Sequence, residues 1–583
     1  MTAPASVPPS GMPAPRPRLR RNTDPQQAVR ARGEPMVWLC GGALAVCLLM
    51  VFGLLGFVLW QGMATFWPSR VSELVLRDGT VRLGEITRTS TFVPTAPQRA
   101  EAPEAVRAAI GDQLVRRRLI RTGHTGEDFH WVPDYLIQDE RLPEWPLVVE
   151  RQGVVEPTSY GRVYGYPLAL LRDGQAVAGE PAEIVAQVDR ELAGVHARNE
   201  QIAALRKHGI GGLSATEDDA RLAARGAELR HGTNSAEHTA AVAAWRALEK
   251  AHEPERSALS QQIDGLLAEQ KRLALRLRRG DGGERDVYLA DIVRTYPANR
   301  LSFGERLGVF ADRWWEFLTA EPRESNQEGG VWPAIFGTVL MTLVMSLLVV
   351  PLGVLAALYI REYAKGGFVI SAIRVAVNNL AGVPSIVFGV FGLGFFCYIV
   401  GGSIDALFYP ERLPNPTFGK GALIWASLTL ALLTLPVVIV ATEEALAAVP
   451  GSMREGSYAC GASKWQTIRR IVLPRAMPGI MTGAILAMAR GAGEVAPLML
   501  VGAAKLVPDL PFDGEAPYLH PSRSFMHLGF HIYDLGFQSQ NSEAAKPMVF
   551  TTTLLLIGVI VLLNVCAIWL RSRLRRKFVA AQF

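Results

Sequence analysis

Long runs of apolar residues alternate along the chain with polar and charged segments. A helix needs about 20 mostly apolar residues to cross the hydrocarbon core of a bilayer. Six runs are close to this length or longer: 36–60, 331–360, 376–400, 421–441, 477–502 and 550–570. The pattern therefore predicts an α-helical membrane protein with six transmembrane helices.

The first apolar run, residues 36–60, is preceded by several arginines, as a secretory signal would be. Its apolar core is longer than the roughly 7–15 residues of a signal, and no small-residue cleavage site follows it cleanly. We therefore expect a retained transmembrane helix. Residues 1–35 are rich in proline, alanine and arginine without apolar periodicity, which predicts a disordered cytoplasmic tail.

The longest polar segment, residues 61–330, separates the first two apolar runs and is long enough to fold around its own core. Near its start, apolar and polar residues alternate on both sides of Asp78-Gly79, which predicts a β-hairpin with a two-residue turn. Further along, an extended stretch rich in valine and tyrosine ends at a second such pair, Asp173-Gly174. The segment is thus expected to begin as a β-rich unit.

Later parts of this segment have helical periodicity. Apolar residues recur at spacings of three and four in 181–207 and in 254–279, which predicts an antiparallel helical hairpin. The glycine-containing stretch 208–219 is expected to form the turn region, and 220–250 to contribute further helix. Residues 61–330 are therefore interpreted as a large α+β insert whose hairpin is either a solvated spacer or an arm that docks a partner.

The net charge of +6 comes largely from short basic segments beside the apolar runs. Lysine and arginine concentrate on the cytoplasmic side of membrane helices. A cytoplasmic N-terminus and six crossings place the segment 443–475 and the basic C-terminal end, with its tail 578–583, in the cytoplasm as well. The insert and a second loop, 503–548, then lie outside. Because topology accounts for the charge, we expect contact with membrane lipid and no nucleic-acid partner.

The sequence gives little support for a metal site. None of the five cysteines lies in the insert, and no CxxC or zinc-ligand spacing occurs. His527 and His531 lie four residues apart, but no glutamate occupies the HExxH position and no third ligand is evident. We therefore expect an ordinary histidine pair and no cofactor bound by this chain.

The segment 443–475 carries a motif with long fixed spacings. Two small residues follow a glutamate, three more precede a glycine, and nine more precede an isoleucine and a leucine–proline pair. The fixed positions are Glu455, Gly461, Ile471, Leu473 and Pro474. This pattern resembles the EAA loop of ABC-importer permeases, with Gly456 and Ser457 where that family has alanines. The resemblance implies that these residues couple the permease to an ATPase subunit.

The same residues predict a shape for this segment. Small residues around Ser457 favour a short helix, Gly461 favours a turn, and the basic stretch 465–471 favours a second helix. Together these elements would form an L-shaped projection that can enter a groove on a partner.

The flanking sequences extend the resemblance over residues 331–576. The stretch NNLAGVPSIVFG, the stretch 460–502 and the stretch FMHLGFHIYDLG are similar to phosphate-specific ABC-importer permeases of the PstA type. This resemblance implies a type I ABC-importer permease core, residues 331–577, that imports inorganic phosphate across the inner membrane into the cytoplasm. It implies nothing about the insert.

The resemblance also implies partners: a second homologous permease, two ATPase subunits and a periplasmic phosphate-binding protein. ATP would be used by the ATPase subunits, because this chain contains no GxxxxGK[ST] phosphate loop. The nearest string, Gly419-Lys420-Gly421, lacks the upstream glycine and the following hydroxyl residue. We therefore expect a transporter subunit that is not itself an enzyme.

Two charged residues, Arg490 and Glu494, lie in the fifth apolar run. Being four apart, they should share one helix face and pair. Charges at membrane depth usually face a bundle interior or a wet cavity, and a guanidinium matches a phosphate oxyanion well. We predict a substrate pathway formed by this pair together with Asn378 and Ser385 of the glycine- and proline-containing third run.

Three alternatives remain open on the sequence alone. The charged pair can instead fix helix packing. The transported anion can be another oxyanion, such as sulfate or molybdate, since an arginine alone cannot choose among them. The chain can also be a membrane receptor for phosphate-starvation signalling.

Overall fold

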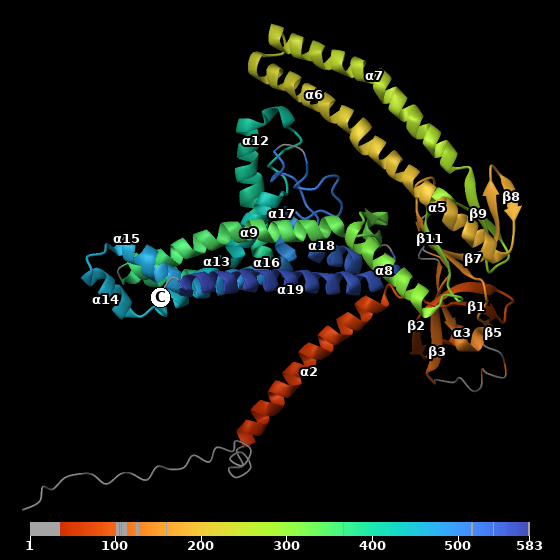
Figure 1. Ribbon diagram of the computed structural model, residues 1–583, viewed down its shortest axis with the longest axis horizontal. Coiled ribbons are helices and arrows are strands. Elements are labelled where there is room, and N and C mark those ends of the chain that lie inside the picture. The colour runs from red at the N-terminus through yellow and green to blue at the C-terminus, as the bar shows by residue number, and fades with distance from the viewer. Residues whose placement is uncertain are drawn as a thin grey trace, which may run out of the picture. The chain divides into compact units, whose positions relative to one another are not determined.

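The computed structural model (Figure 1) describes residues 35–100, 104, 107, 113–123, 128–158, 160–364, 366–514, 517–539 and 541–580. The predicted tail 1–35 lies outside the described residues except for Pro35, and so do residues 581–583 of the predicted tail 578–583. The chain divides into two units, Met1–Leu59 and Trp60–Phe583. Helix α2 (Pro35–Ala64) contains the first predicted transmembrane helix.

Among the described residues, six helices are long and apolar enough to cross a membrane, which confirms the predicted number. They are Trp38–Ala64, Trp332–Tyr363, Ser385–Phe408, Leu423–Ala447, Lys464–Gly493 and Ser542–Arg573. The third begins later than predicted because Pro384 disfavours helical backbone at the residue before it. The fifth begins earlier than predicted because its helix continues into polar sequence, where hydropathy gives no signal.

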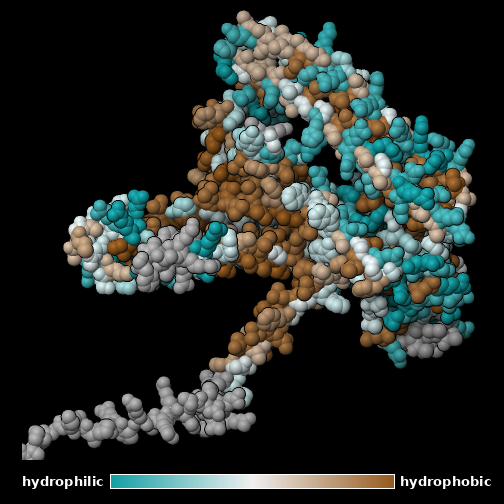
Figure 2. Space-filling view, viewed as in Figure 1, coloured by the Kyte–Doolittle hydropathy of each residue, from teal (hydrophilic) through white to brown (hydrophobic). Residues whose placement is uncertain are grey.

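Within the unit Trp60–Phe583, helix α13 (Leu423–Ala447) is the most buried of the membrane spans. It contacts α9 (Trp332–Leu358) and α16 (Leu473–Gly493), and these helices lie side by side in Figure 1. A Cβ added at Gly483 would lie 2.6 Å from Cβ of Ala441, so glycine allows α16 to approach α13 closely. Figure 2 shows hydrophobic side chains covering this helical region, as a lipid-facing surface requires.

Shorter elements complete this domain. The remaining helices are α10 (Phe368–Leu380), α11 (Ser385–Phe391), α12 (Gly402–Phe408), α14 (Gly451–Ala459), α15 (Lys464–Thr467), α17 (Ala496–Val501), α18 (Leu528–Tyr533) and α19 (Ser542–Ala580). Four segments are π-helical: Tyr359–Tyr363, Gly392–Gly401, Ile468–Val472 and Asp534–Gln538.

The insert contains two antiparallel sheets, which confirms its predicted α+β class. The first sheet has the order β4-β3-β2-β1-β5, and the second has the order β10-β9-β7-β6-β11 with β8 beside β7. The first comprises β1 (Val71–Leu76), β2 (Val81–Phe92), β3 (Val115–Arg121), β4 (Phe129–Pro133) and β5 (Ile137–Arg141). The second comprises β6 (Leu147–Gln152), β7 (Tyr160–Arg172), β8 (Gln175–Ala178), β9 (Leu273–Arg278), β10 (Glu284–Tyr288) and β11 (Ile292–Pro297). The ribbon β12 (Pro322–Arg323) and β13 (Glu328–Gly329) follows.

The hairpin predicted at Asp78-Gly79 is present, and the extended stretch that ends at Asp173-Gly174 also turns back as a hairpin there. Gly79, with φ of 87°, lies in the turn between β1 and β2. Asp173 and Gly174, with φ of 52° and 80°, join β7 to β8. Positive φ at both Asp173 and Gly174 is the geometry of a type I′ turn, whose twist matches that of paired strands.

The predicted turn region 208–219 is wrong, because this stretch is helical. Helix α5 (Pro181–Ala204) continues through a π-helical segment, Leu205–Ile210, into α6 (Gly211–His231). The chain reverses only at Gly232, with φ of 87°, and α7 (Ala236–Gln270) then pairs with α6 (Figure 1). Glycines lower helix propensity in this stretch, but long-range packing across the hairpin overrides it.

The predicted helix 254–279 is also wrong beyond Gln270, where α7 ends. Leu273 and Leu277 lie on strand β9 and are buried in the core that joins the second sheet to α5. A spacing of four residues fits both a helix and every second position of a strand, so these two leucines did not distinguish the alternatives. Leu275 between them is also buried in this core, because residues two apart on a strand point to the same face.

The last long helix of the insert is α8 (Phe303–Thr319), which begins with a capping box between Ser302 and Glu305. Its Phe317 is buried in a cluster with Phe66 and with Met526 of the membrane domain. The insert and the membrane helices therefore share a hydrophobic contact at this point.

Candidate functional site

The segment 443–475 folds as two short helices joined by a tight turn. Helix α14 ends before Gly461, whose φ of 81° is a left-handed conformation that favours glycine. Helix α15 begins with a capping box between Ser463 and Gln466. The hydroxyls of Ser457 and Thr467 lie 2.8 Å apart and join the two helices. The two helices and the turn that the sequence predicted are present.

Arg454 fixes this projection to the ends of two membrane helices. Its guanidinium donates to the carboxylate of Glu362 at 2.9 Å and to the carbonyl oxygens of Leu446 and Val449 at 2.9 and 2.8 Å. The side chain of Ile468, at the base of the projection, is buried in the cluster formed by the ends of α9 and α13. A movement of the projection would therefore be transmitted to both helices.

The predicted motif residues divide into two groups. Glu455 and Gly461 are exposed, whereas Ile471, Leu473 and Pro474 are half-buried beside the bundle. Two large side chains of the projection also face solvent, Tyr458 at 43% exposure and Trp465 at 57%. Exposed aromatic side chains are typical of a surface that a partner covers. The sequence motif did not identify the anchoring role of Arg454.

Arg490 and Glu494 are paired, but not on one helix face as predicted. Helix α16 ends at Gly493, and Glu494 has extended backbone, with φ of −78° and ψ of 134°. The weak helix formers Gly491 and Gly493 explain this early end. Nε of Arg490 still lies 3.5 Å from a carboxylate oxygen of Glu494, and the two side chains are 36% and 21% exposed. The position of Arg490 in the last helical turn also places its charge near the negative end of the helix dipole.

The other two predicted pathway residues lie in different surroundings. Ser385 begins α11, which packs on α17 just beyond Glu494; a Cβ at Gly389 would lie 2.7 Å from Cα of Pro497. Asn378, on α10, instead lines a cavity of about 210 Å³. That cavity is also lined by Ile360, Arg374, Val377, Ile439, Val440, Glu443 and Glu444. The structure does not bring Asn378 to the charged pair.

Comparison with known proteins identifies the family. Residues 349–579 match the family model described as binding-protein-dependent transport system inner membrane component. The chain is 30% identical over 271 residues to the probable ABC transporter permease protein YqgI of Bacillus subtilis, covering 46% of this chain and 86% of that protein. The chain belongs to this family. The predicted fold class, an α-helical membrane protein with six transmembrane helices, a type I ABC-importer permease core and a large α+β insert, is thereby confirmed. The protein is a multi-pass inner-membrane permease subunit.

Two further relatives align over a shorter part of their length. The permease is 34% identical over 203 residues to the probable ABC transporter permease protein YqgH of Bacillus subtilis, covering 34% of this chain and 62% of that protein. It is 40% identical over 204 residues to the phosphate transport system permease protein PstA of Mycobacterium leprae, covering 35% and 61%. The permease thus spans less than two thirds of the length of these two relatives.

The permease's histidine pair is packed in its interior. His527 and His531 are 0% and 2% exposed, and Nδ1 of His527 accepts from the backbone N–H of Gly529 at 3.1 Å. Burial lowers the pKa of His527 to about 3 and that of His531 to about 4, so both are neutral at physiological pH. Among the described residues, no group of three or more possible ligands surrounds a common metal position.

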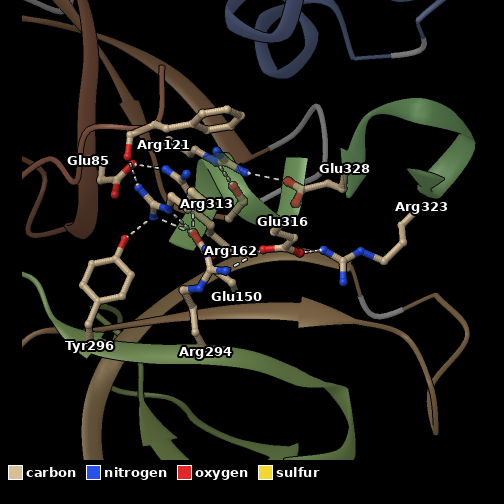
Figure 3. Close-up of polar contacts among 12 residues, drawn as sticks. Glu85, Arg121, Glu150, Arg162, Arg294, Tyr296, Arg313, Glu316, Arg323 and Glu328 are labelled. Carbon is tan, nitrogen blue, oxygen red and sulfur yellow. Dashed lines mark hydrogen bonds and ion pairs between the residues drawn. The ribbon is translucent and has the colours of Figure 1, made fainter. Parts of the chain in front are cut away.

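The permease's insert contains a buried ionic network that sequence reasoning missed (Figure 3). Its centre is Glu150 on β6, which lies between three arginines from three other elements. Arg162 of β7 and Arg294 of β11 each lie 3.1 Å from the carboxylate, and Arg313 of α8 approaches to 2.5 Å. Arg162 also pairs with Glu85 of the first sheet at 2.9 Å. The network joins both sheets to the helix that leads into the membrane.

Burial alone would raise the pKa of Glu150, but the charges of Arg313, Arg162 and Arg294 outweigh it and hold that pKa far below its ordinary value of 4.5. A carboxyl with a lowered pKa stabilises the fold above its unfolded pKa, and the stabilisation is lost as pH falls through the folded pKa. The network therefore contributes fully at neutral pH and weakens below about pH 4.5.

We expect Glu150→Gln to destabilise the permease by about 3–5 kcal/mol, because the buried Arg313 and the half-buried Arg162 and Arg294 lose their shared counter-ion. The measurement is denaturant unfolding of the purified chain in detergent at pH 7 and at pH 4, where the difference from the parent should shrink. Glu144→Gln is the matched control, since Glu144 pairs with Arg300 while 74% exposed and should change stability by less than about 0.5 kcal/mol. Equal effects of the two variants would contradict the prediction.

Proposed function

We propose that the chain is the membrane permease subunit of an ATP-driven importer that moves inorganic phosphate from the periplasm to the cytoplasm. The observation that carries the proposal is the 40% identity over 204 residues to a protein described as a phosphate transport system permease. The anchored projection supports the energy-coupling part, because its exposed face is free for an ATPase subunit and its base is bound to the transmembrane helices.

The proposed assembly contains a second homologous permease, two ATPase subunits and a periplasmic phosphate-binding protein. ATP is used by the ATPase subunits, and this chain binds no cofactor. Both chain ends and the coupling segment 443–475 lie in the cytoplasm, while the insert 61–330 and the loop 503–548 lie in the periplasm. The basic residues around α14 and α15 support this orientation, since such residues favour the cytoplasmic side.

For the substrate step, we propose that Glu494 neutralises Arg490 in the resting state and that phosphate replaces the Glu494 carboxylate transiently during passage. The 3.5 Å separation of the two groups supports a pair loose enough to open, because a well-formed charged hydrogen bond is about 2.7–2.9 Å. Ser385 belongs to this pathway through the packing of α11 on α17. Asn378 is a weaker candidate, since it lines a separate cavity.

Coupling between the two parts follows the helix that joins them. From Pro474 to Arg490 the chain is helical without a break, a rise of about 24 Å at 1.5 Å per residue. In this proposal, closure of the ATPase subunits moves α14 and α15, and the rigid α16 carries the movement to the charged pair. Helix α16 thus links the ATPase-binding segment to the proposed substrate pathway.

The function is tested by uptake of labelled phosphate into a strain that lacks its own phosphate permease and carries this chain with its partner subunits. We expect restored uptake that excess unlabelled phosphate blocks and that sulfate and molybdate do not. Restored uptake of labelled sulfate or molybdate, without restored uptake of phosphate, would assign another oxyanion. A phosphate-starvation response that depends on the chain while uptake does not would favour the receptor alternative.

A further inference from the structure

A second cavity lies in the insert, between its two sheets and far in sequence from Arg490. It encloses about 340 Å³ and is lined by β2 of the first sheet and by β6, β7 and β10 of the second. Four arginines face it: Arg82, Arg151, Arg279 and Arg285. Three carboxylates, Asp128, Asp281 and Glu324, also line it, and the hydroxyls of Thr80, Thr122, Thr158, Tyr160 and Tyr164 add further polar groups.

Arg82 is the decisive residue of this cavity. Its Nε and Nη1 are buried, and within the described part of the chain neither has a hydrogen-bond partner. The hydroxyl of Tyr164, whose side chain is 2% exposed, is buried without a partner in the same part of the chain. Burying donors without partners costs free energy that a folded protein ordinarily avoids, so their accumulation around one cavity points to a missing acceptor.

The other charged groups of the cavity do not supply the acceptor that Arg82 and Tyr164 lack. The guanidinium of Arg279 pairs with Asp281 at 2.7 Å, so this carboxylate is already used. Burial, with the charge of the neighbouring Arg285, lowers the pKa of Arg151 to about 10, although the carboxylates of Glu156, Asp291 and Asp128 act in the opposite direction. Burial and the charge of Arg82 lower the pKa of His130 as well, so this histidine is not a competing cation.

We propose that this cavity is a binding site for a small inorganic oxyanion, held by Arg82 from the first sheet and by Tyr164, Arg151 and Arg285 from the second. A tetrahedral oxyanion supplies several acceptor oxygens and negative charge, which matches the fork of N–H donors on a guanidinium. Because its ligands come from both sheets, the bound anion would bridge them and stabilise the insert. The site is separate from the transport pathway and does not depend on the proposed function.

The test measures equilibrium binding of labelled inorganic phosphate, and separately of labelled sulfate, to the purified full chain in detergent. The chain carries Arg490→Gln, which removes the proposed pathway contact. We expect one saturable site for at least one of the two anions, with the same anion raising the melting temperature. Adding Arg82→Gln should weaken binding at least tenfold and abolish the thermal shift. Arg172→Gln removes a charge from β7 at an arginine that is 58% exposed and outside the cavity, and it should change neither.

Tyr164→Phe keeps the ring and removes only the hydroxyl, so it tests the site even if Arg82→Gln fails to fold. We expect it to weaken binding severalfold. Saturable binding of either anion, or of both, supports the site and defines its selectivity. Absence of saturable binding for both anions, or binding by Arg82→Gln and Tyr164→Phe that equals the parent, would overturn the proposal. Failure of phosphate uptake with intact binding would reject the proposed function and leave this site standing.

Discussion

Arg490→Gln is expected to abolish phosphate uptake while leaving the permease folded and assembled with its partner subunits. Glutamine retains a similar length but loses the charge and the forked donors that an oxyanion requires. Charged hydrogen bonds are worth about 1.5–3 kcal/mol each, so losing two of them should reduce uptake at least about 100-fold. The measurements are labelled phosphate uptake and co-purification of the partner subunits from the same membranes.

The design separates a transport role of this pair from a packing role. Glu494→Gln leaves Arg490 without its counter-ion, so we expect tighter phosphate binding, seen as a lower KM, together with slower turnover. Arg571→Gln serves as the matched control, because Arg571 is an arginine of the last span and donates a 2.8 Å hydrogen bond to the Thr482 hydroxyl, away from the charged pair. If Arg490→Gln and Glu494→Gln both reduce assembly to the same degree, the pair fixes helices and the transport role is excluded.

The membrane part of the fold was predictable because its signals are local. Each span is a continuous apolar run, and the motif from Glu455 to Pro474 specifies its turn and both helices within 20 residues. The end of α16 was missed because apolar character continues past Gly493, whereas the helix stops at glycines whose effect hydropathy does not record. The predicted pairing of Arg490 with Glu494 is nevertheless present, because the long arginine side chain reaches across the end of the helix.

The insert was less predictable because its decisive contacts join distant positions. Glu150 meets Arg294 and Arg313, which follow it by more than 140 residues, and each is one charged residue on an otherwise ordinary strand or helix. Likewise, Arg82 and Tyr164 face one cavity from two different sheets. No spacing pattern in the sequence predicts contacts between residues that are so far apart in the chain. The end of the helix at Gln270 was missed for a different reason. The leucines that follow it are spaced four apart, which fits the periodicity of a helix as well as that of a strand.

Gly461→Val is expected to uncouple the permease from its ATPase subunits. The backbone φ of 81° at this turn is strained for any residue with a Cβ, by about 1–2 kcal/mol, and more for a β-branched one. No atom lies within 4 Å of the position that a Cβ would take, so the effect arises from the backbone and not from a clash. Relief of the strain would change the angle between α14 and α15 and break the 2.8 Å contact of Ser457 with Thr467. We expect uptake and ATPase co-purification to fall at least tenfold.

Gly456→Ala is the matched control for this turn. Gly456 lies inside α14 with no atom within 4 Å of a Cβ position, so alanine fits and should favour the helix by about 1 kcal/mol. Uptake should stay at the parent level or rise slightly. The melting temperature of the purified chain should be unchanged in both variants, because the projection lies outside the buried core that Ile468 and Val472 form with α9 and α13. Normal co-purification and uptake by Gly461→Val would show that the angle of the projection does not matter, and the coupling role would then have to be assigned to its buried base.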